Sequence, residues 1–169
     1  AVILVGYPQI TRTMRVSEQL VNTQAQKSHY VMMMYSTVRE RSVSLLRMAI
    51  VDDPFERDEE YLRFNEFAAQ YVINRDALSG LMGTKEEQAL FRTLRALAEA
   101  SAPMQKQVSE LLLDDRNDEA DALLKGSAIP RQQKMLSFLD DMLSRQERKV
   151  KRTVTLARRN DRDTALVMG

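Results

Sequence analysis

The sequence predicts an all-α protein, an antiparallel up-down-up-down four-helix bundle whose first and last helices are long. Two observations lead to this prediction. Apolar residues recur at helical 3–4 spacing over long stretches, and helix-start signals divide the chain into four such stretches. The 169 residues are 44% apolar and 29% charged, with five Gly and four Pro, as is typical of one soluble helical domain.

The first predicted helix covers residues 10–51, a stretch without Pro or Gly. About 40 residues of α-helix measure about 60 Å, which is too long for a compact globule. This helix is therefore expected to belong to a bundle or a coiled coil. The apolar residues expected to face inward are Leu20, Val31, Met34, Val38, Leu45 and Met48.

A strong start signal opens the second predicted helix, residues 54–80. Asp53 is suited to cap the helix, and Pro54 occupies its first position. Glu56 is placed to complete a capping box, and Gly80 to end the helix. Its apolar side is expected to carry Tyr61, Phe64, Ala68, Tyr71, Leu78 and Met82.

The third predicted helix covers residues 84–113 and opens with a capping box between Thr84 and Glu87. Pro103 falls inside its apolar pattern, which continues on both sides. A kink is therefore expected there and not a helix end. Its inward face is expected to carry Leu90, Leu94, Leu97, Ser101, Met104, Val108 and Leu111.

The fourth predicted helix covers residues 118–162, with Asn117 or Asp118 as its cap. Gly126 and Pro130 lie near its start, so its first turns are expected to be bent or separate.

The unequal helix lengths predict a two-helix stem. If the tight corners are aligned, residues 10–24 and 145–163 extend past the shorter inner helices. Both segments lead to apolar ends, residues 1–6 and 164–169, which resemble the remains of membrane spans. Ordinary soluble ends stay an alternative. The basic residues of the second segment also weigh against an external location, because such segments favour the cytoplasmic side of a membrane.

Several chemistries are excluded by composition. The chain has no Cys, a single His (His29) and a net charge of +1. Thiolate metal sites, disulfides and histidine-dependent triads are thus out of reach, and no overall charge favours nucleic acid. We expect no cofactor, no metal site and no enzymatic activity in this domain. Met32, Met33 and Met34 point in different directions on a helix, so packing is expected of them and not metal binding.

Two local patterns add a family resemblance. The first is an arginine-bearing helix end, the acidic corner DDPFERDEE (residues 52–60), and then a helix with Arg75 near its middle. The second is NDEADALL (residues 117–124), followed by Pro130 and the periodic segment 132–146. With the helix layout, these patterns resemble the four-helix-bundle sensor domain of bacterial chemoreceptors and related transmembrane signalling proteins.

The resemblance covers residues 10–160 and implies an extracytoplasmic sensory domain. Such a domain is held at the inner membrane by flanking spans, faces the periplasm and forms a homodimer through its first helix. It binds a small molecule or a periplasmic binding protein. It passes a helix displacement to a cytoplasmic output, such as a chemotaxis signalling tail, a histidine kinase or a cyclic-dinucleotide cyclase.

The resemblance also suggests a ligand site. In receptors of this type, arginines on the first helix hold a carboxylate near the dimer interface, and Arg39, Arg41 and Arg47 lie in a suitable segment. Arg41 falls between Val38 and Leu45 on the inward face, so its charge should be partly buried and need a partner. Guanidinium groups bind carboxylates through two parallel hydrogen bonds.

Arg75 on the second helix and Arg131 on the last are further candidates for ligand binding. The alternative is structural: arginines in a bundle commonly pair with acids, here with Glu40 or the acids of the second helix. For the domain as a whole, the competing hypothesis is a soluble helical scaffold that acts by protein contact. A helical-bundle enzyme is disfavoured because the chain has no metal-ligand set, nucleophile–base pair or phosphate loop.

Overall fold

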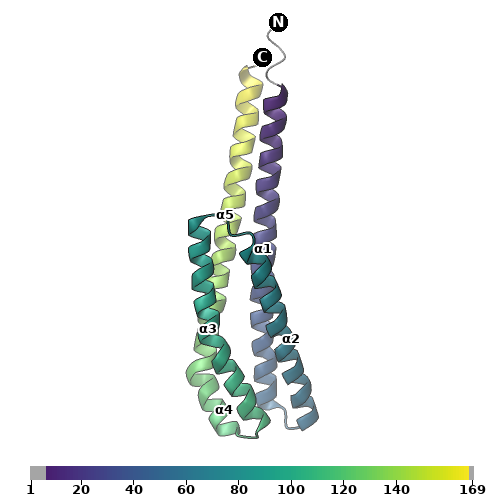
Figure 1. The fold of residues 1–169 in the computed structure, drawn as a ribbon, viewed down its shortest axis with the longest axis vertical. Helices are drawn as coiled ribbons and strands as arrows, with labels where there is room; N and C mark the ends of the chain where they lie inside the picture. Colours follow the sequence, from purple (N-terminus) through teal and green to yellow (C-terminus); the bar gives the residue numbers. More distant parts are fainter. Residues whose placement is uncertain (1–6, 168–169) are drawn as a thin grey trace. The chain divides into compact units, whose positions relative to one another are not determined.

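The computed structural model describes the backbone of residues 7–167 and the side chains of residues 18–156 (Figure 1). The predicted apolar ends, residues 1–6 and 164–169, lie outside the residues whose side chains are described. The all-α, antiparallel four-helix bundle is confirmed, and α4, η1 and α5 together form its fourth helix. The elements are α1 (Tyr7–Ile50), α2 (Pro54–Ser79), α3 (Lys85–Leu113), α4 (Asn117–Leu123), the π-helical turn η1 (Leu124–Ala128) and α5 (Ile129–Val167).

The chain divides into two compact units. Residues 30–142 form what we call the bundle unit, and residues 1–29 with 143–169 form the paired-helix unit. Within the described residues, the paired-helix unit consists of the start of α1 and the end of α5. Leu20, predicted to face inward, is 50% exposed in this unit. Two helices leave much of each other's surface uncovered, which explains why this prediction was wrong.

The corner between α1 and α2 begins with a side-chain cap. Asp53 is the N-cap and accepts a hydrogen bond from the Phe55 amide at 2.8 Å, and Pro54 opens the helix as predicted. Glu56 is exposed and does not complete the predicted capping box, because the Asp53 carboxylate accepts from the amide one residue earlier than such a box requires.

Arg57 closes the same corner from inside. It is 8% exposed, and its Nη1 donates to the Leu112 carbonyl oxygen at 2.9 Å and to the Asp115 carboxylate at 2.6 Å. Its Nη2 donates to the Val51 carbonyl oxygen at 3.1 Å. One side chain thus ties the end of α1 to the end of α3. The sequence predicted the acidic corner at residues 52–60, but it did not predict that Arg57 joins the two helix ends.

The turn between α2 and α3 carries the predicted capping box. The Glu87 amide donates to the Thr84 hydroxyl at 3.1 Å, and the Glu87 carboxylate accepts from the Thr84 amide at 3.2 Å. Gly80 caps α2 as expected, and α3 continues through Pro103 without ending.

The start of the fourth helix differs from the prediction. Arg116 is the N-cap of α4 and makes no side-chain capping bond, so neither Asn117 nor Asp118 is the cap. The expected irregularity near Gly126 is the π-helical turn η1, where one extra residue per turn is accommodated without ending the helix.

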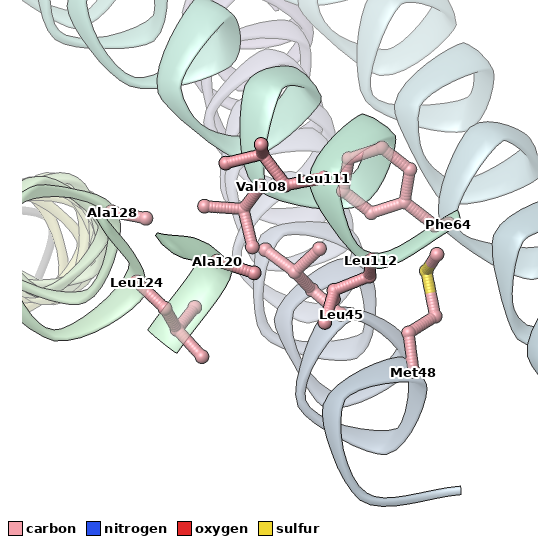
Figure 2. Packing of buried hydrophobic residues seen from close by; sticks show 9 residues of the cluster. All are labelled: Leu45, Met48, Phe64, Val108, Leu111, Leu112, Ala120, Leu124 and Ala128. Carbon is pink, nitrogen blue, oxygen red and sulfur yellow. The ribbon is translucent and has the colours of Figure 1, made fainter. Parts of the chain in front are cut away.

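One core cluster of the bundle unit lies where α1, α2, α3, α4 and η1 meet. Figure 2 shows its buried side chains, with Phe64 of α2 among them. Removing such apolar surface from water stabilises the unit by about 25 cal/mol per Å². The cluster contains Leu45, Met48, Phe64, Val108, Leu111, Leu112, Ala120, Leu124 and Ala128.

Candidate ligand-binding cavity

A half-open cavity of about 250 Å³ lies among α1, α2, α3 and α5 of the bundle unit. This volume is just below the range of about 300–1,000 Å³ that is usual for drug-sized ligands, so it suits a small one. Most of the wall is apolar, and the polar groups come from three helices. The lining residues are Thr37, Val38, Arg41, Ala68, Tyr71, Val72, Arg75, Ala98, Glu99, Ser101, Ala102, Gln105 and Met135.

Arg41 supplies the charge of this cavity. Its side chain is half-buried, its guanidinium carbon lies 4.1 Å from the centre of the Phe64 ring, and its Nε atom is buried without a hydrogen-bond partner. No carboxylate among the described side chains forms an ion pair with it. Burial lowers the pKa of Arg41 to about 10, so it remains a cation at neutral pH.

Two neutral polar groups in the cavity also lack partners. The Tyr71 hydroxyl on α2 and the Ser101 hydroxyl on α3 are both buried. Neither forms a hydrogen bond with any described residue. Burial raises the pKa of Tyr71, an effect that the nearby Arg75 charge opposes, so its phenol stays protonated. Buried polar atoms are nearly always hydrogen-bonded, so these two hydroxyl groups would need a water molecule or a ligand as their partner.

Arg75, the second predicted arginine in this cavity, is already engaged. Its Nε and Nη2 atoms donate to one carboxylate oxygen of Asp76 at 2.9 and 2.7 Å. The sequence left open whether Arg75 binds a ligand or an acid. The structure places it at the cavity with the Asp76 carboxylate beside it.

Arg39 and Arg47 lie away from the cavity, on the exposed surface of α1. Arg39 is within 3.5 Å of the Glu40 carboxylate, and Arg47 within 3.5 Å of the Glu60 carboxylate on α2. These are the pairs that the structural alternative anticipated. Both Arg39 and Arg47 therefore have an acid next to them. Of the predicted arginines, Arg41 and Arg75 line the cavity, and Arg39 and Arg47 do not.

Arg131 and its neighbour Gln132 attach α5 to the walls of the cavity. Arg131 donates from Nη1 to the Ala100 carbonyl oxygen of α3 at 2.9 Å. Gln132 donates from Nε2 to the Val38 carbonyl oxygen of α1 at 3.4 Å. Arg131 therefore contacts the backbone behind the cavity and is not part of its lining.

Sequence reasoning did not select Tyr71 or Ser101 as site residues. Both stood on predicted apolar faces, and their hydroxyl groups were the signal that could have found them. A polar side chain on an inward face needs a partner, and the identity of that partner depends on the neighbouring helices.

Other site types receive no support in the part of the chain that the structure describes. No group of three or more His, Cys, Asp or Glu side chains is placed there to hold a metal ion. None of the described helices is long and apolar enough to cross a membrane.

The fold is a four-helix bundle with a small cavity among its helices. Comparison with known families identifies its class. Residues 1–160 match the family described as a four helix bundle sensory module for signal transduction, and the chain belongs to this family. A search of curated proteins gives no match.

Proposed function

We propose that this sensory module is the periplasmic ligand-binding domain of a receptor in the inner membrane, and that it binds a small carboxylate in the cavity at Arg41. The observation that carries the proposal is the unpaired Arg41 cation beside a cavity of about 250 Å³. A buried charge without a partner is costly, and a carboxylate ligand would offset that cost with charge-assisted hydrogen bonds. The module itself is proposed to be non-enzymatic.

Transmission of the signal is proposed to run through α5. Met135 of α5 lines the cavity, and Arg131 and Gln132 bond α5 to the backbones of α3 and α1. A ligand that moves the cavity walls therefore acts directly on α5. The helix displacement is proposed to reach a cytoplasmic output domain outside this chain.

A homodimer through α1 is also proposed, because three exposed apolar residues of this helix in the bundle unit lie on one side of it, with the exposed Arg39 between them. Met32, Leu46 and Ile50 are 54%, 43% and 77% exposed, and their spacing puts them on one side of the helix. Analytical ultracentrifugation tests this proposal. Leu46→Glu should weaken self-association relative to Lys106→Glu on α3, and equal association of both variants would contradict it.

Ligand binding is tested by a thermal-shift screen of amino acids and organic acids with the 169-residue chain. A ligand that binds only the folded state raises the melting temperature by mass action. We expect at least one carboxylate to do so, and Arg41→Met to abolish its effect. Arg39→Met on the exposed side of the same helix is the matched control and should keep the effect. A hit that is indifferent to Arg41 would contradict the proposed site.

Location is tested separately in the full-length protein. The chain has no Cys, so Asp58→Cys, at an exposed position of α2, introduces one unique thiol in it. A membrane-impermeant maleimide should label this thiol in intact cells. Labelling that occurs only after lysis would place the domain in the cytoplasm.

A further inference from the structure

We propose that the Arg41 cavity is a complete binding site within one chain, and that it takes a small monocarboxylic acid with an apolar body and no ammonium group. This inference rests on the proposed function and narrows it in two ways. It names the chemistry of the ligand, and it places the site away from any α1–α1 interface.

The apolar body of the ligand follows from the cavity wall. Apolar side chains from all four surrounding helices line it, so a ligand with no apolar surface would leave this wall in contact with water. These apolar residues are Val38, Ala68, Val72, Ala98, Ala102 and Met135.

A single carboxylate follows from the charges. Arg41 is the one cation of the lining without an acid beside it, since Arg75 is bonded to Asp76. A second carboxylate on the ligand would be desolvated without a free cation to pair with. Its burial would therefore cost binding free energy.

The lack of an ammonium group follows from the acids of the cavity. Glu99 is the only acidic residue in the lining, its side chain is 69% exposed, and it is bonded to Arg95 at 3.3 Å. An α-ammonium group would thus meet no free carboxylate and would be repelled by Arg41. The site should discriminate against amino acids in favour of their deaminated analogues.

The orphan hydroxyls supply the remaining hydrogen bonds. Ser101 is 3% exposed, it lines the cavity together with Tyr71, and the hydroxyl groups of both have no described partner. Arg41, Tyr71 and Ser101 come from α1, α2 and α3 of the same chain. Charged hydrogen bonds are each stronger than neutral ones, so a carboxylate bound by these groups is favoured over an uncharged amide.

The geometry of α1 separates the cavity from the exposed apolar face. Arg41 is nine residues from Met32 and nine from Ile50, which is about two and a half helical turns in each direction. Arg41 therefore lies on the opposite side of α1 from these exposed residues. This arrangement differs from the expectation, drawn from the family resemblance, of a ligand held near the dimer interface.

Isothermal titration calorimetry of the 169-residue chain with matched ligands tests the inference. The apolar acids 3-phenylpropanoate and 4-methylpentanoate differ from L-phenylalanine and L-leucine only by the α-ammonium group. The amide 3-phenylpropanamide removes the charge, and succinate adds a carboxylate and removes most of the apolar body.

We expect at least one of the two apolar acids to bind with one molecule per chain. Its dissociation constant should not change with protein concentration. The corresponding amino acid, the amide and succinate should bind at least about tenfold more weakly, the scale of one charge-assisted interaction. Arg41→Met should abolish binding, Tyr71→Phe and Ser101→Ala should weaken it, and Arg39→Met should leave it unchanged. Circular dichroism confirms that each variant is folded.

Different results would overturn the ligand chemistry proposed here and the proposed function on which it rests. Arg41-dependent binding of an amino acid or of succinate in preference to the apolar acids would overturn this inference and leave the proposed function standing. One ligand per two chains would overturn the single-chain site. Binding that does not depend on Arg41, or no binding of any of these compounds, would overturn both the ligand class and the Arg41 site.

Discussion

Two arginines of the bundle unit, Arg57 and Arg41, are drawn away from solvent into very different surroundings. Arg57 donates three hydrogen bonds to groups at the ends of α1 and α3. Arg41 makes no hydrogen bond to any described residue and lies over the face of Phe64. The first arrangement holds a corner closed, whereas the second leaves a cation available to something from outside the chain. Arginines on inward faces of one bundle can therefore serve stability or binding, and their partners distinguish the two roles.

The largest effect is expected at the corner. Arg57→Met should lower the free energy of unfolding by about 3 kcal/mol, because it leaves the Val51 and Leu112 carbonyl oxygens without this donor. Urea denaturation measures the loss. Arg95→Met is the matched control, since Arg95 is 58% exposed and its pair with Glu99 should contribute less than about 1 kcal/mol. Equal losses of unfolding free energy in both variants would show that the hydrogen bonds of Arg57 stabilise the fold no more than an exposed ion pair does.

Arg41→Met should change the free energy of unfolding in the opposite direction. Removing an unpaired, partly desolvated cation should raise the free energy of unfolding by about 1–2 kcal/mol, even after the loss of the contact with Phe64. The same variant should lose ligand binding, which is a trade of function for stability. Urea denaturation without ligand provides the measurement. A clear loss of stability would mean that Arg41 has a structural role like that of Arg57.

The contribution of Arg41 to the free energy of unfolding should also depend on pH in a defined way. Burial lowers the pKa of Arg41 to about 10, well below its value in the unfolded chain, so the unfolded chain binds more protons between these two values. Stability should therefore rise with pH in that range through Arg41, and its destabilising effect should be constant below it. The difference in free energy of unfolding between wild type and Arg41→Met should not change from about pH 6 to about pH 9. A difference that varies strongly in this range would contradict the assignment.

The smallest effect is expected at Tyr71. Tyr71→Phe removes a buried hydroxyl that has no described partner, so the free energy of unfolding should change by less than about 1 kcal/mol. Affinity for the carboxylate ligand should fall all the same. A large loss of stability without ligand would instead reveal a structural hydrogen bond to this hydroxyl, for example through water.

The helices were predictable because their signals are local. The Thr84 capping box, the Pro54 helix start and the continuation through Pro103 all depend on residues within a few positions of each other. The errors lay where local signals compete. Arg116 and not Asn117 or Asp118 precedes α4, and Leu20 is exposed where only two helices pair.

The sequence by itself determined the four-helix bundle and the inward position of Arg41, because helical periodicity places each residue on a known side of its helix. Only the tertiary structure decided what Arg41 meets there. Phe64, Tyr71 and Ser101 come from other helices, and no local pattern specifies which side chains of packed helices face each other. The same packing gave Arg57 its partners and placed the Glu60 carboxylate beside Arg47, and it left Arg41 without an acid. The acid beside Arg39 is its sequence neighbour Glu40.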